Sequence, residues 1–188
     1  MFVPGSDQPV DSDVALIVID MLNPYDHEDA ELLTENVASM VPTLARLVGD
    51  ANEGDVELVY VNDNYGDFAA TRDDLVRAAQ QGRRPDLIEP ILPPEGVAFL
   101  QKARHSAFYS TALDHLLRQR SIETVVLTGQ VTEQCILYTA LDAYIRHFDI
   151  RVVRDAVAHI DEELGDAALR MMESNMRVDL VDAEDCLR

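Results

Sequence analysis

Positive charge is scarce in this sequence of 188 residues. Only 15 lysines and arginines face 35 aspartates and glutamates, which gives a formal net charge of −20 at pH 7. Proteins that bind nucleic acids or anionic membranes need a cationic surface. The composition therefore argues against both kinds of partner, and it is typical of a heavily solvated acidic surface.

Cysteine is also scarce, and tryptophan is absent. Two cysteines, Cys135 and Cys186, do not form the disulfide framework of a small secreted protein. The first 13 residues show neither the basic start nor the apolar stretch of a secretory signal. No apolar run approaches the roughly 20 residues of a membrane span. We therefore expect a cytoplasmic protein with no membrane partner, folded as one domain over residues 1–188.

Several common site motifs are missing as well. The five histidines form no HxH, HExxH or Asp-x-His pattern, so no metal site is expected. Neither glycine-rich phosphate motif occurs, GxGxxG or GxxxxGKS/T, and the GxSxG elbow of serine hydrolases is absent. The sequence therefore predicts a protein without metal or nucleotide cofactor.

Short apolar runs alternate with helical periods along the chain. Strands are predicted at 14–19, 56–61, 125–127, 150–153 and 178–181, and helices at 34–49, 111–120, 132–147 and 162–173. Thr34 is the expected N-cap of the first helix, and Pro42 should bend it or mark a later start. Apolar strands joined by helix-length connections are typical of a parallel sheet. We expect a three-layer α/β/α fold, with ligands bound beyond the carboxyl ends of the strands.

The polar stretch 64–94 has no clear periodicity. Long excursions of this kind often cover a site. Arg83 and Arg84 within it could receive a substrate carboxylate, or they could form a solvated surface pair.

Residues 124–144 carry the clearest chemical signal. The apolar run 125–127 stops at Thr128-Gly129, and a helical pattern then opens with Cys135 in its first turn. Free N–H groups and positive dipole potential at a helix start lower the pKa of a thiol, and they can hold an oxyanion. The alternative is a small buried apolar side chain. Cys186 has no such setting.

Two further residues could act with Cys135. Asp20 ends the first predicted strand, although it could simply close that strand. Lys102 is the only lysine among the 15 basic residues, and it lies beside aromatic residues, although surface lysines are common. Together the three would provide a base, a cation and a nucleophile.

With these residues in place, the chain resembles the isochorismatase-like hydrolase superfamily, in particular its cysteine hydrolases, which include nicotinamidases and N-carbamoylsarcosine amidases. The resemblance covers nearly the whole chain, through ALIVIDM, QKARHSAFYSTALDHLL, VVLTGQVTEQCILYTALDAY and VVRDAV. It implies a six-stranded, mainly parallel sheet of strand order 3-2-1-4-5-6 and a catalytic triad of Asp20, Lys102 and Cys135. It also implies a cis peptide bond between Gln130 and Val131, with the N–H groups of Val131 and Cys135 as the oxyanion hole.

The departures from the family pattern bear on the substrate. Nicotinamidases carry an Asp-x-His-x-x-His-like metal site after the second strand, whereas residues 62–68 here read NDNYGDF. Zinc and nicotinamide are therefore not expected. Isochorismatases hydrolyse a vinyl ether and need no thiol, so Cys135 favours attack on an amide. Thr132-Glu133 replaces the family's usual Thr-Asp.

The sequence thus predicts a metal-independent cysteine hydrolase that cleaves the C–N bond of a small amide or carbamoyl substrate through a thioester. The alternatives are a vinyl ether hydrolase, and a non-catalytic thiol redox or binding protein on the same scaffold. His105 could touch a substrate. The family usually oligomerises, so a homo-oligomer is expected, with residues 64–94 or adjacent helices at the interface. The expected substrate-binding residues are Asn23, Tyr25, Phe68, Phe108 and Tyr109.

Overall fold

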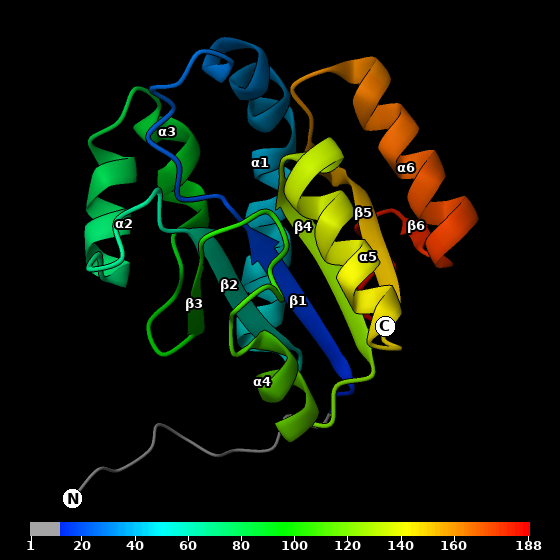
Figure 1. The fold of residues 1–188 in the computed structure, drawn as a ribbon. Helices are drawn as coiled ribbons and strands as arrows, with labels where there is room; N and C mark the ends of the chain where they lie inside the picture. Colours follow the sequence, from blue (N-terminus) through cyan, green and yellow to red (C-terminus); the bar gives the residue numbers. More distant parts are fainter. Residues whose placement is uncertain (1–11) are drawn as a thin grey trace, which may run out of the picture.

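The computed structural model describes residues 12–188, so most of the segment expected to lack a secretory signal lies outside the described residues. The strands are β1 (Val14–Ile19), β2 (Glu57–Asp63), β3 (Ala98–Lys102), β4 (Thr124–Gln130), β5 (Asp149–Ala158) and β6 (Asp179–Val181). All neighbours are parallel, in the order β3-β2-β1-β4-β5-β6 (Figure 1). The predicted sheet and strand order are confirmed.

Helices cover both faces of this sheet (Figure 1). They are α1 (Ala30–Glu53), α2 (Arg72–Gln80), α3 (Pro85–Ile88), α4 (Leu113–Gln119), α5 (Leu137–Ile145) and α6 (Glu162–Met176), with a 3-10 turn η1 (Glu89–Ile91) and a π-helical turn η2 (Thr132–Ile136). Alternate residues of β1 serve two separate cores, because successive side chains of a strand point to opposite faces. Leu16 and Val18 pack with α1 and α3, while Ala15, Ile17 and Ile19 pack with α4, α5 and α6.

The first helix differs from the prediction at its start and at its proline. Asp29 occupies the N-cap position, and Thr34 lies inside α1, where its hydroxyl donates to the carbonyl of Glu31. The helix also continues through Pro42. Buried apolar side chains both before and after the proline, such as Val37 and Leu44, pack on the sheet. This packing outweighs the hydrogen bond that proline cannot make.

The polar excursion 64–94 is folded into α2, α3 and η1. Thr71 caps α2 in a reciprocal capping box with Asp74, and Pro85 lies in the first turn of α3. Both are recognised helix-start signals, but these helices are too short to show a clear apolar period. The strand β3, which follows, was not predicted from the apolar pattern, since it is only half-buried along most of its length.

Several polar side chains lie at the carboxyl ends of four adjacent strands. Asp20 directly follows β1, while Asp63, Lys102 and Gln130 are the last residues of β2, β3 and β4. In a parallel sheet these ends share one edge, which is where α/β proteins bind ligands. The fold therefore gathers residues up to 110 positions apart, such as Asp20 and Gln130, into one place.

The helix α5 exposes Tyr138, Leu141, Tyr144 and Ile145 to solvent. The expected homo-oligomer stays a prediction, and an apolar surface of this kind is suited to an interface. Within residues 12–188, none of the helices has the length and apolar character needed to cross a membrane.

The approach of β4 to β1 depends on Gly129, and this generates a test of the fold. Gly129 has φ of +107°, and a Cβ there would overlap the backbone of Ile19. We expect Gly129→Ala to lower the free energy of unfolding by about 3 kcal/mol or more, measured by urea denaturation. The control is Gly49→Ala, in α1, where a Cβ meets nothing within 4 Å. Equal stability of the two variants would contradict the packing described for β1 and β4.

Candidate active site

A buried lysine lies at the centre of the strand-end cluster. The Nζ atom of Lys102 lies 2.7 Å from Oδ2 of Asp20 and 3.6 Å from Oδ2 of Asp63. The same Nζ lies 3.5 Å from Sγ of Cys135. Lys102 is only 2% exposed, so its charge is compensated by these neighbours rather than by water. The structure thus brings the three predicted catalytic residues together.

The Asp20 carboxylate is held from two sides. One oxygen contacts Lys102, and the other accepts a hydrogen bond of 2.7 Å from the backbone N–H of Asp63. The backbone of Asp20 adopts φ of +55°, and its N–H donates to the carbonyl of Val61. These contacts fix the carboxylate at the sheet edge and orient it toward the lysine.

Burial controls the proton affinities of the three groups. It raises the pKa of Asp20 above its usual value, although the charge of Lys102 opposes this. Burial also acts against the charged form of Lys102, but the neighbouring Asp20 and Cys135 outweigh it and raise the pKa of the ammonium. Asp20 is therefore a stronger base than a solvated aspartate, and Lys102 stays a cation.

The thiol does not behave as its position in the sequence led us to expect. Burial, followed by the charge of Asp20, raises the pKa of Cys135 well above its usual range, and the nearby Lys102 only partly offsets this. The expected lowering of this pKa at a helix start is therefore wrong. Desolvation disfavours the thiolate more strongly than the helix start favours it. The raised pKa of Cys135 favours its protonated form, and this thiol lies beside the carboxyl group of Asp20, which the charge of Lys102 helps to keep ionised.

The turn between β4 and α5 presents the thiol to a cavity. The peptide bond between Gln130 and Val131 is cis, at the place that the family resemblance implies. The carbonyl of Val131 accepts hydrogen bonds from the N–H groups of Gln134 and Ile136, which hold the turn closed. Val131 and Cys135, whose N–H groups are the expected oxyanion hole, both line the cavity.

This cavity has a volume of about 370 Å³. His105 lies on its wall with Nδ1 at 3.7 Å from the sulfur of Cys135, and its ring stacks on Tyr138 at 5.4 Å. The lining residues come from the carboxyl edge of the sheet, the loops beyond it, the first turn of α1 and the turn η2: Asp20, Asn23, His27, Asp29, Leu33, Asp63, Tyr65, His105, Gln130, Val131, Gln134, Cys135 and Ile160.

The predicted substrate-binding residues divide into two groups. Asn23 lines the cavity. Tyr25 is buried just outside it and donates from its hydroxyl to the side chain of Gln130, which in turn donates to the carbonyl of Asp20. Tyr25 therefore supports the wall of the site rather than facing the cavity.

The other three aromatic residues lie away from the cavity at Cys135. Phe68 is 81% exposed and Tyr109 is 56% exposed. Phe108 is buried in the core, where its ring stacks on Phe148 at 5.8 Å. Phe108 and Tyr109 lie in the segment that connects His105 to α4, and neither residue lines the cavity.

Arg83 and Arg84 also lie outside this cavity. Arg84 pairs with Asp86 at 2.7 Å, and both arginines line a separate cavity with Tyr25 and Glu31. The surface-pair alternative therefore describes Arg84 better than a role in carboxylate binding.

Three polar residues at the strand ends were not assigned a role in the site from the sequence. Asp63 contacts both Lys102 and Asp20, and Gln130 bonds the backbone of Asp20. Asn62 bonds both the N–H and the carbonyl of Leu22, which fixes the loop after β1. All three lie at or next to the carboxyl end of a strand, and this position is the feature of the sequence that could have identified them as site residues.

Comparisons with known proteins agree with this arrangement. Residues 14–185 match the family model described as Isochorismatase domain. The uncharacterized isochorismatase family protein YaaI of Bacillus subtilis is 32% identical, over 94% of this chain and 97% of its own. The maleamate amidohydrolase of Pseudomonas putida is 28% identical, over 93% and 85%. The crystal structure of N-carbamoylsarcosine amidase from Thermoplasma acidophilum superposes with a TM-score of 0.70 and 30% identity, over 92% of this chain and 97% of that one.

The raised pKa of the Cys135 thiol can be tested by alkylation. Because a protonated thiol is a poor nucleophile, iodoacetamide should label Cys135 more slowly than a free cysteine peptide at pH 7, with the rate increasing about tenfold per pH unit and still rising above pH 9. Asp20→Asn removes a negative charge that raises this pKa and leaves Lys102 in place, so labelling at pH 8 should become faster. Asp166→Asn, an exposed change on α6, is the control. Wild-type labelling faster than the peptide at pH 7 would show that the thiolate is already formed.

Proposed function

Because the chain belongs to the isochorismatase family and is a hydrolase, we propose that it is a cysteine amidohydrolase that cleaves the C–N bond of a small amide or carbamoyl compound. The observation that carries this proposal is the contact of Lys102 with both Asp20 and Cys135 at the wall of an open cavity. The names of two relatives, a maleamate amidohydrolase and an N-carbamoylsarcosine amidase, support amide chemistry on this scaffold.

In the proposed first half-reaction, Asp20 accepts the proton of the Cys135 thiol as the sulfur attacks the substrate carbonyl carbon. The raised pKa of Asp20 favours this transfer. Lys102 stabilises the thiolate as it forms, and the N–H groups of Val131 and Cys135 bind the oxyanion. The tetrahedral intermediate then breaks its C–N bond. Asp20 gives its proton to the leaving nitrogen, and ammonia or an amine departs from a thioester.

In the second half-reaction, water replaces the amine in the cavity. Asp20 takes a proton from this water, which attacks the thioester carbonyl and releases a carboxylic acid. The sulfur of Cys135 leaves as a thiolate and recovers the proton from Asp20. The enzyme returns to the neutral thiol and carboxylate described above.

The two alternative functions make different demands on the same residues. An isochorismatase-type vinyl ether hydrolase would release pyruvate from isochorismate rather than ammonia from an amide, and it would not need Cys135. A thiol redox protein would need a second thiol near Cys135. Cys186 is the other cysteine, and it is buried in the opposite core, among residues that pack with α1. The placement of the two thiols therefore favours hydrolysis over disulfide exchange.

The lysine can be tested by replacement. Lys102→Met leaves the carboxylates of Asp20 and Asp63 without their cation, so Asp20 should remain protonated and no longer act as a base. We expect ammonia release from a panel of small amides to fall about 10²-fold or more, since comparable electrostatic groups in active sites contribute this much. Lys102→Arg should recover little activity, because a planar guanidinium does not fit a point-charge position. Cys135→Ala should abolish turnover.

The control for this experiment is Arg104→Met, which removes an exposed positive charge two residues away. Circular dichroism of each variant distinguishes a catalytic defect from unfolding. Near wild-type turnover by folded Lys102→Met protein would refute the proposed mechanism.

Metal independence can be tested by chelation. Among residues 12–188, no group of three or more His, Cys, Asp or Glu side chains is arranged to hold a metal ion. We expect amide hydrolysis to survive prolonged dialysis against EDTA. Loss of activity that added zinc or iron restores would overturn this part of the proposal.

A further inference from the structure

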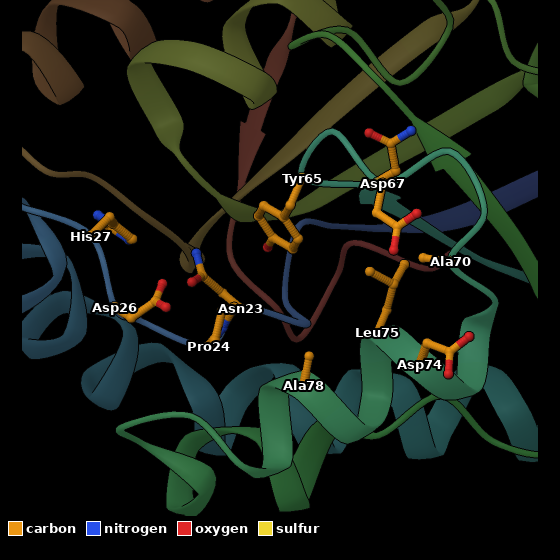
Figure 2. Close-up of a pocket in the computed structure, with 11 residues that line it drawn as sticks. Asn23, Pro24, Asp26, His27, Tyr65, Asp67, Ala70, Asp74, Leu75 and Ala78 are labelled. Atoms are coloured by element: carbon orange, nitrogen blue, oxygen red, sulfur yellow. The ribbon is translucent and has the colours of Figure 1, made fainter.

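A second cavity lies beside the one at Cys135. Its volume is about 360 Å³, and it lies between the loop after β1, the loop after β2 and the helix α2 (Figure 2). Asn23, His27 and Tyr65 line both cavities, so the two adjoin. The full lining is Asn23, Pro24, Asp26, His27, Asn64, Tyr65, Asp67, Ala70, Asp74, Leu75 and Ala78.

The side chain of Tyr65 lies between the two cavities and is held there by hydrogen bonds. Its hydroxyl donates to the carbonyl of Leu22 at 2.8 Å, and its backbone N–H donates to the carboxylate of Asp63 at 2.7 Å. Asp63 also contacts Lys102, so Tyr65 is tied to the catalytic cluster itself. A substrate held at Cys135 would therefore pass Tyr65 before it reached the second cavity.

The second cavity combines apolar and acidic surface. Leu75 and Ala78 of α2 face Tyr65 and Asn23 across it, while Asp67 and Asp74 lie at one side (Figure 2). Asp26 and His27 lie at the other side. An apolar stem fits between α2 and the loop, and the carboxylates favour a positive charge at its end.

The residues that line the two cavities carry a net negative charge. Asp20, Asp29 and Asp63 line the first cavity, and Asp26, Asp67 and Asp74 line the second. Asp74 pairs with Arg77 at 2.9 Å, and Asp20 and Asp63 share Lys102, so Asp26, Asp29 and Asp67 supply most of the net negative charge. Within residues 12–188, no lysine or arginine lines either of these cavities. Lys102 is buried behind the first one, where Asp20 and Asp63 already compensate its charge. A carboxylate on the substrate would lie near Asp26, Asp29 and Asp67 and would find no lysine or arginine among the described lining residues, which disfavours its binding.

From these observations we propose that the substrate is an amide whose far end is an apolar stem with a cationic group, bound in the second cavity beyond Tyr65. This inference rests on the proposed amidohydrolase function. It names a substrate class that a carboxylate-bearing amide such as maleamate does not belong to.

Three amides with the same number of carbon atoms, six, test the charge preference: 6-aminohexanamide, hexanamide and adipic acid monoamide. We expect kcat/KM for ammonia release to be about tenfold or more higher for the cationic amide than for the anionic one, with the difference reduced in high salt. The double variant Asp26→Asn with Asp67→Asn should lower the ratio of kcat/KM for the cationic amide to kcat/KM for the anionic amide. Its control, Asp166→Asn with Glu173→Gln on the exposed side of α6, removes the same charge elsewhere and should leave the ratio unchanged. Equal narrowing by both variants would assign the preference to the net charge of the protein and overturn the inference.

The use of the second cavity can be tested by filling it. Ala78 is exposed on α2 and lines the cavity, whereas Gln80 is exposed on the same helix and lines neither cavity. Ala78→Phe should lower kcat/KM for 6-aminohexanamide relative to acetamide, and Gln80→Phe should not change this ratio. An unchanged ratio in Ala78→Phe would show that the stem lies elsewhere.

A measurement that needs no turnover separates this inference from the proposed function. Aminoethyl and sulfonatoethyl methanethiosulfonates carry opposite charges on the same thiol-reactive group, and their rates at Cys135 can be followed by mass spectrometry of the Cys135 peptide. The rate constant of each reagent at Cys135 is divided by its rate constant with a free cysteine peptide. The normalised rate constant of the cationic reagent should be about tenfold higher than that of the anionic reagent, and the Asp26→Asn with Asp67→Asn variant should bring the two closer together. If no amide is hydrolysed but this selectivity holds, the proposed function fails and the cation preference stands. If the anionic reagent or adipic acid monoamide is preferred, the inference is wrong.

Discussion

The ion pair between Lys102 and Asp20 is the interaction on which the rest of the site depends. A buried ammonium is costly unless carboxylates and hydrogen bonds compensate it. Here the compensation comes from Asp20 after β1 and Asp63 at the end of β2, while Lys102 itself ends β3. The ends of three neighbouring strands are thereby held at fixed positions. The same carboxylate that neutralises the lysine is the proposed base, so the contact that stabilises the site also supplies its chemistry.

Burial of this cluster has a consequence for the thiol. The low polarity that strengthens the contact of Lys102 with Asp20 also disfavours the thiolate of Cys135. The site therefore relies on proton transfer to Asp20 during the reaction rather than on a thiolate formed beforehand. Lys102 is also compensated by Asp20 and Asp63, so it does not offset the charges of Asp26, Asp29 and Asp67 in the linings of the two adjoining cavities. One buried cation thus influences both the proposed chemistry and the proposed choice of substrate.

Patterns in the sequence predicted elements well where burial is regular, and less well elsewhere. The continuous apolar runs predicted β1, β2 and β4, because a strand covered on both faces must be apolar throughout. Part of β5 and the edge strand β6 were also predicted from apolar runs, although both have exposed positions. The half-buried strand β3 and the short helices α2 and α3 carry weak patterns and were missed or left as an excursion. Thr34 and Pro42 have strong local preferences for helix starts, yet packing of α1 on the sheet overrides both.

By itself the sequence determined the fold class, the positions of Asp20, Asn62 and Gly129 at or next to the ends of strands, and the rarity that singles out Lys102 and Cys135. These properties follow from local patterns and from composition. Only the tertiary structure decided the pKa of the thiol, the exclusion of Phe68, Phe108 and Tyr109 from the cavity at Cys135, and the second cavity beyond Tyr65. Each of these depends on which side chains from distant segments share one desolvated space. Desolvation and distance are properties of the packed structure, and no single stretch of sequence contains them.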